Sequence, residues 1–156
     1  MKTPTIDYTL RTTWHAVKKM YDEGAKKYGY TMSIGFTLLS IDPVLGTSST
    51  SLGPKMGMES TSLSRLINSM EERKLIKRTK NPKDGRGVII KLTKFGQLKR
   101  EDSKSVVIGF NKEVDEKLNK NEIKNFHKVI YRISEVAKKY EFFKKGQIIM
   151  TTKKIK

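Results

Sequence analysis

The chain has 156 residues, no cysteine, and 33 basic against 16 acidic side chains, which give a formal net charge of +17. This length suits one domain extended by flanking helices, and the lack of cysteine excludes disulfides, thiolate nucleophiles and cysteine zinc sites. With only His15 and His127, and with no apolar segment of the roughly 20 residues that span a bilayer, we expect a soluble cytoplasmic protein without a metal site.

The N-terminal segment predicts a long helix. Its apolar residues recur at helical steps of three and four from Ile6 through Trp14 to Tyr28, and Gly29 would end it. A second helix is expected from about Ser33, burying Ile34, Leu38 and Ile41, and ending near 42 because Pro43 follows.

A third, short helix is expected to end near Met56, before a turn at Gly57. Pro54 fits such a helix only in its first turn, where the missing N–H costs nothing. Residues 60–74 then give the clearest helical pattern of the chain, with Ser60 as its N-cap. One face of this helix is apolar, and the other is short and polar. The apolar residues are Leu63, Leu66, Ile67 and Met70, and the polar ones are Thr61, Ser62, Ser64, Arg65 and Asn68.

After Leu75 the apolar period changes from 3.6 to 2. Residues 76–80 and 88–92 read as two strands joined by a loop that contains Asp84-Gly85, a strong hairpin signal. Thr93 is expected to cap a long helix that follows. A capping box at Asn119 and Glu122 opens a last helix with an apolar stripe. That stripe is formed by Ile123, Phe126, Ile130, Ile133, Ala137 and Tyr140.

The basic charge is concentrated around the hairpin. Residues 1–49 carry net +2, residues 50–100 net +9 and residues 101–156 net +6, and the stretch 73–100 holds eleven basic residues against one acid. A solvated face normally mixes its signs, so this stretch is the expected contact with a polyanion. The basic segment 144–156 is either a frayed tail or a functional arm.

A helix, a glycine turn, a helix with a small polar face and a basic hairpin, in this order, form the plan of a winged helix-turn-helix. The major groove of B-DNA admits one helix, and short donors and acceptors on it can reach base edges. We expect Arg65 to contact guanine and Asn68 adenine, while Thr61, Ser62 and Ser64 contact bases or phosphates. Further DNA contacts are expected from Lys55, Lys77, Arg78, Lys83 and Arg86, with Asp84 and Gly85 shaping the wing tip.

Other interpretations of these residues remain open. Arg65 could form a surface salt bridge, and the charges at Lys77, Arg78 and Lys80 could serve only to discourage edge-strand aggregation. The aromatic stripe at Trp14, Tyr21 and Tyr28 indicates a core or a helix–helix interface rather than a ligand site. For function, the alternative is a non-specific architectural DNA- or RNA-binding protein. An enzyme is not expected, because no glycine-rich phosphate loop, paired catalytic carboxylates or activated nucleophile is present.

Residues 50–96 resemble the MarR family of bacterial transcriptional regulators. The resemblance depends on the Leu63-Ser64-Arg65-Leu66 core of the second motif helix, the exit 71–76, the Asp84-x-Arg86 wing tip and the Leu92-Thr93-x-x-Gly96 start of the next helix. It implies a homodimer whose N- and C-terminal helices interlock, two lobes that read a palindrome, and entry of Arg86 into the minor groove. Some members respond to small aromatic ligands, whereas the absence of cysteine excludes the oxidant-sensing branch.

Two residues depart from the family pattern. Pro54 lies in the first helix of the motif, and Lys74 stands where the family usually has glycine. The expected architecture is mainly α with a small β-hairpin wing, in one domain that covers 1–156. It comprises a winged helix-turn-helix lobe at about 33–92, dimerisation helices at about 5–29 and 93–142, and the basic tail. The expected function is a sequence-specific regulator, a repressor that binds double-stranded DNA as a homodimer and responds to an unidentified small-molecule effector, without cofactor or membrane contact.

Overall fold

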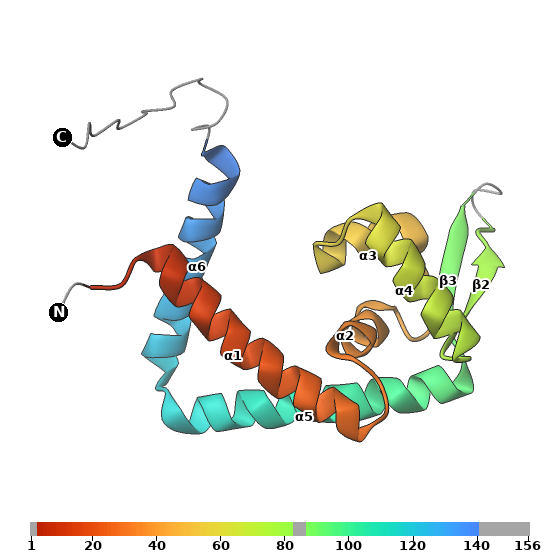
Figure 1. The fold of residues 1–156 in the computed structure, drawn as a ribbon, viewed down its shortest axis with the longest axis horizontal. Coiled ribbons are helices and arrows are strands. Elements are labelled where there is room, and N and C mark those ends of the chain that lie inside the picture. Colours follow the sequence, from red (N-terminus) through yellow and green to blue (C-terminus); the bar gives the residue numbers. More distant parts are fainter. Residues whose placement is uncertain (1–2, 83–86, 141–156) are drawn as a thin grey trace, which may run out of the picture. The chain divides into compact units, whose positions relative to one another are not determined.

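The computed structural model describes residues 3–82 and 87–140 (Figure 1). The chain divides into two compact units, one up to Asn111 and one from Lys112 onward. In chain order the described elements are α1 (Ile6–Lys27), α2 (Met32–Ser40), β1 (Thr47–Ser48), α3 (Ser49–Met56), α4 (Ser60–Glu72), β2 (Ile76–Lys80), β3 (Val88–Leu92), α5 (Lys94–Lys117) and α6 (Lys120–Lys139). The predicted mainly helical fold with a small β wing is confirmed. None of the described helices is long and apolar enough to cross a membrane.

The first two helices begin and end close to the predicted residues. Helix α1 ends at Lys27, and Gly29 takes a left-handed φ of 80° that reverses the chain. The Thr31 side chain accepts a hydrogen bond from the Ile34 amide and so caps α2. The predicted burial of Ile34, Leu38 and Ile41 is confirmed, with Leu38 fully buried.

The core of the first unit lies between α2, α3, α4 and the sheet. Its best-buried side chains come from every one of these elements, so the polar face of α4 is backed by a continuous apolar layer. The largest fully buried apolar side chains are Leu38, Ile41, Leu52, Met70, Ile76 and Ile90. Burial of such side chains contributes roughly 1.5–3 kcal/mol each, so this layer holds the helices and the sheet of the first unit together.

The sheet has three strands in the order β1-β3-β2, both pairs antiparallel. The two predicted hairpin strands are confirmed with their predicted bounds. The two-residue strand β1 was not predicted; it pairs Thr47 with Ile90 and Ser48 with Ile89. Gly46 precedes it with a φ of 78°, and a Cβ there would lie 2.7 Å from the Ile90 carbonyl oxygen, so only glycine lets this strand approach β3.

Two expectations for the helix-turn-helix were wrong in detail. Helix α3 begins at Ser49, capped by the Ser48 side chain, so Pro54 lies inside the helix and not in its first turn. A proline at this position has no N–H to donate to the preceding turn of the helix, and α3 ends two residues later at Met56. In α4, Ser60 is the first helical residue and Glu59 occupies the N-cap position without a side-chain cap bond, one residue earlier than predicted.

The exit of α4 and the start of α5 are joined by hydrogen bonds. Thr93 Oγ1 accepts the Gly96 amide, as expected of an N-cap, and donates to the Lys74 carbonyl at 2.6 Å. Helix α4 ends at Glu72, two residues before the predicted end, and Lys74 follows with φ 57°. Left-handed φ values strain residues with a side chain, so the position where the family usually has glycine is one that favours glycine.

In the second unit the predicted capping box is confirmed. Asn119 Oδ1 accepts the amides of Asn121 and Glu122, and Glu122 Oε2 accepts the Asn119 amide in return. Helix α6 carries its apolar residues at helical spacing, yet none of its side chains is buried. Taken by itself, this helix therefore has an apolar stripe without a covering element.

Candidate nucleic-acid interface

The outer face of α4 presents the polar side chains that the sequence singled out. All five of the predicted contact residues on this helix are exposed: Thr61, Ser62, Ser64, Arg65 and Asn68. Thr61, Arg65 and Asn68 stand at i, i+4 and i+7 and so share one stripe of the helix. On the opposite face Leu63, Ile67 and Met70 are buried, so the polar stripe is held outward by the core.

The turn before α4 fixes how this helix is presented. Gly57 takes φ 61°, and the Met58 amide donates to the Gly53 carbonyl at 3.0 Å, which ends α3 and redirects the chain. A Cβ on Gly53 would lie 3.3 Å from the Met58 carbonyl oxygen, so α3 packs closely against the turn that leads into α4. Lys55 lies exposed in the last turn of α3.

The hairpin beside α4 carries basic residues on both faces. The register pairs Lys77 with Lys91 and Arg78 with Ile90, and side chains alternate between faces along a strand. Since Ile90 is fully buried against the core, Arg78 lies on the α4 side of the sheet and Lys77 on the other side. Like charges opposite one another, as at Lys77 and Lys91, oppose strand pairing unless an anion lies nearby. The wing-tip residues Lys83, Asp84, Gly85 and Arg86 lie outside the described residues.

Arg78 makes contacts that sequence reasoning missed. Its guanidinium forms an ion pair with Glu71 through Nη1 and donates from Nη2 to Asn68 Oδ1. Its backbone amide also donates to Glu71 Oε1 at 3.2 Å. The sequence shows a glutamate and an arginine seven residues apart, but only the return of β2 along α4 brings them together. Arg65, by contrast, forms no ion pair with another described residue, so its donors remain available.

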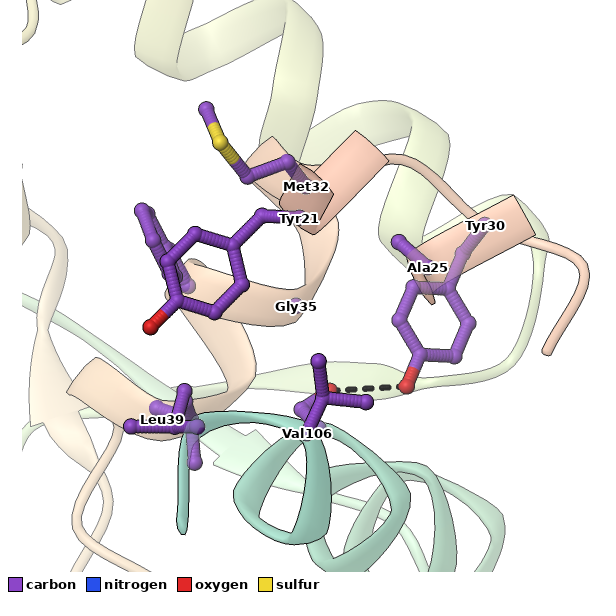
Figure 2. A pocket seen from close by; sticks show the side chains of 10 residues that line it. Tyr21, Ala25, Tyr30, Met32, Gly35, Leu39 and Val106 are labelled. Carbon is purple, nitrogen blue, oxygen red and sulfur yellow. Dashed lines mark hydrogen bonds between the residues drawn. The ribbon is translucent and has the colours of Figure 1, made fainter. Parts of the chain in front are cut away.

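A small cavity lies away from this face, among α1, α2 and α5 (Figure 2). Its volume is about 20 Å³, enough for one water molecule but not for an aromatic ligand. At its edge the Tyr30 hydroxyl and Ser103 Oγ are hydrogen bonded at 2.8 Å, and burial raises the pKa of Tyr30. Tyr21 of the predicted aromatic stripe also lines it, and burial raises its pKa as well.

A larger open concavity of about 470 Å³ lies along α2 and α3. Aromatic and methionine side chains form most of its wall, and Lys55 is also among the lining residues. The lining includes Trp14, Met32, Phe36, Met56 and Met58. Its size falls in the usual range for small-molecule sites. The sequence had assigned Trp14 to a core or helix interface, and the structure leaves this side chain 51% exposed.

Comparison with known proteins agrees with this geometry. Residues 32–88, from α2 to the start of β3, match the MarR family. No curated protein sequence matches the chain. Solved structures with a similar fold include an S. aureus MepR–DNA complex, with a TM-score of 0.77, 20% identity, and coverage of 85% of this chain and 98% of MepR.

Two further similar structures hold small molecules. CouR from Rhodococcus jostii RHA1, bound to p-coumaroyl-CoA, gives a TM-score of 0.74 at 20% identity over 85% of this chain and 95% of CouR. The PcaV regulator from Streptomyces coelicolor, in complex with its natural ligand, gives 0.71 at 17% identity over 88% and 99%. The predicted resemblance to MarR-family winged-helix regulators is thereby confirmed at the level of fold.

Proposed function

We propose that this chain, which has the fold of MarR-family transcription regulators and matches that family over 32–88, is a sequence-specific DNA-binding repressor. The observation that carries the proposal is the exposed stripe of Thr61, Arg65 and Asn68 on α4, with Leu63, Ile67 and Met70 buried behind it. A helix so presented can enter the major groove, where arginine and amide side chains distinguish base edges. In this proposal the winged helix-turn-helix lobe at about 33–92 binds DNA, and the flanking helical segments at about 5–29 and 93–142 form the dimer.

We also infer that the active form is a homodimer. Along α1, Ile6 and Trp14 are 62% and 51% exposed, and along α6 Phe126 is 57% exposed. Exposed apolar side chains at helical spacing are unfavourable in water, and such a patch indicates an interaction surface. A second copy that covers them would form a two-fold dimer and place two recognition helices about one DNA turn, roughly 34 Å, apart.

The proposal includes relief of repression by a small molecule. The concavity lined by Trp14, Phe36 and Met56 supports this step, because its aromatic and thioether walls suit a planar apolar ligand and Lys55 suits an attached anionic group. CouR and PcaV, whose fold this chain shares, were solved as ligand complexes.

Selection of bound duplexes from a random DNA pool, with the full chain, tests the proposal. We expect enrichment of a two-fold symmetric sequence, preferred over random duplex by roughly 10³ or more. Enrichment of no sequence would instead favour the non-specific architectural role.

The homodimer is tested separately by light scattering. Phe126→Glu should shift the chain toward monomer, whereas Lys128→Glu, an exposed change two residues away on the same helix, should not. A wild-type chain that stays monomeric at micromolar concentration would refute the dimer.

A further inference from the structure

The side chains of Glu71, Arg78 and Asn68 form one connected chain of contacts beside the recognition stripe. Glu71 holds Arg78 at two points, through its backbone amide and through its guanidinium. The same guanidinium reaches Asn68 with its other terminal nitrogen, at 2.5 Å. Because Glu71 and Asn68 lie three residues apart on α4, one arginine from β2 bridges both.

This arrangement fixes which end of the Asn68 amide is available. An arginine has only donors, so the atom it contacts must be the amide oxygen. An amide oxygen has two lone pairs, and Arg78 occupies one of those of Oδ1. The NH₂ group of Asn68 has no acceptor among the described residues. Asn68 thus offers the groove two free donor hydrogens and only one remaining acceptor lone pair, which lies beside the guanidinium of Arg78.

An asparagine held in this way favours a different base from a free one. Bidentate contact with adenine requires the amide to accept from N6 and to donate to N7. Guanine presents two acceptors, N7 and O6, in the same positions, and an NH₂ group can donate to both. The N6 amino group of adenine, also a donor, would instead have to share Oδ1 with the guanidinium of Arg78.

We propose that Arg78, held by Glu71, is a positioning residue that sets Asn68 to prefer guanine over adenine at its base position. This inference rests on the proposed sequence-specific DNA binding. It also replaces, for Asn68, the adenine contact expected from sequence, and gives Arg78 a role other than a phosphate contact.

The test measures binding of the full chain to duplexes that carry each base at every position of the selected site. Asn68→Ala first identifies the position at which discrimination is lost, and the wild type should prefer guanine there. Arg78→Met should then free the amide oxygen and raise the adenine-to-guanine affinity ratio roughly tenfold, the worth of one bidentate contact. The matched control is Lys77→Met, which removes the same charge from the opposite face of the sheet and should weaken all duplexes evenly.

Glu71→Gln keeps the arginine but loosens its hold, and should move the ratio in the same direction by a smaller factor. If circular dichroism shows that Arg78→Met does not fold, the base preference of Glu71→Gln tests the inference instead. A ratio that neither variant changes, or a wild-type preference for adenine at this position, would overturn the inference while leaving specific binding intact. A wild type that selects no sequence would overturn the proposed function itself.

Discussion

Gly96 permits the close approach between α5 and the exit of α4, and its replacement by alanine is expected to destabilise the lobe strongly. A Cβ at this position would lie 1.8 Å from the carbonyl oxygen of Leu75 and 2.8 Å from its carbonyl carbon. Both atoms belong to the backbone, so no side-chain rotation relieves the clash. The same carbonyl accepts hydrogen bonds from the Thr93 amide at 3.1 Å and from Thr93 Oγ1 at 3.2 Å.

The size of the stability loss can be estimated from the backbone shift that a Cβ at Gly96 would require. Opening the contact to 3.0 Å, the shortest that Cβ atoms tolerate, requires a backbone shift of more than 1 Å. Overpacking of this kind costs roughly 1–3 kcal/mol, and two weakened hydrogen bonds to Leu75 add about 1–3 kcal/mol together. The helix propensity of alanine returns about 1 kcal/mol. We expect a net loss of roughly 1–5 kcal/mol in the free energy of unfolding.

Gly109 is the matched control, because it lies exposed in the same helix and a Cβ there meets nothing within 4 Å. Gly109→Ala should therefore stabilise the chain by about 0.5–1 kcal/mol through helix propensity alone. Urea unfolding, at one protein concentration so that any association is held constant, measures both variants. A Gly96→Ala variant that is as stable as the wild type, or more stable, would refute the reasoning.

The remaining predictions concern the lobe. Lys74→Gly should raise the free energy of unfolding by about 0.5–1 kcal/mol, since it relieves a left-handed φ of 57°; a lower urea midpoint would contradict this. Hydrogen bonds from the amides of Leu45 and Val44 lower the pKa of Asp42. The stability this carboxylate contributes is therefore full above the ordinary pKa of about 3.9 and is lost as pH falls through the lowered value. Asp42→Ala should thus cost more at pH 7 than at pH 2 in urea titrations, and equal losses would exclude the ionised carboxylate as the cause. Arg65→Ala should cost about 1–3 kcal/mol of binding and relax one base position per half-site, and a uniform loss over all sequences would reassign it to phosphate. Lys77→Ala should lower the slope of log affinity against log salt by about one contact per lobe without changing the preferred sequence, and a changed preference would contradict its assignment to phosphate.

Sequence patterns predicted the elements whose signals are local. The strands 76–80 and 88–92 follow from a period of two around a turn, and the capping box at Asn119 from four adjacent residues, so both were placed correctly. The apolar face of α4 was predicted for the same reason. These features depend on neighbours within one or two turns of chain, which a sequence displays directly.

The features that were missed depend on residues far apart in the chain. Strand β1 is two residues long and exists only because β3, some forty residues later, offers it an edge. The pairing of Arg78 with Glu71 likewise exists only because β2 returns along α4. The sequence alone shows that Lys74 departs from the family pattern. Only the structure shows the positive φ at this position, which explains why glycine is usual there.

The basic residues of the lobe do not all contribute to DNA affinity, and the composition alone does not show which of them do. Eleven basic residues lie between 73 and 100, yet Arg78, Lys99 and Arg100 each have an acidic partner in the structure. Only cations that meet phosphates release counterions and steepen the salt dependence of binding. The slope should therefore fall short of what the net +9 of residues 50–100 suggests. In this view Arg78 affects which sequence is bound through Asn68, and contributes little to how tightly DNA is held.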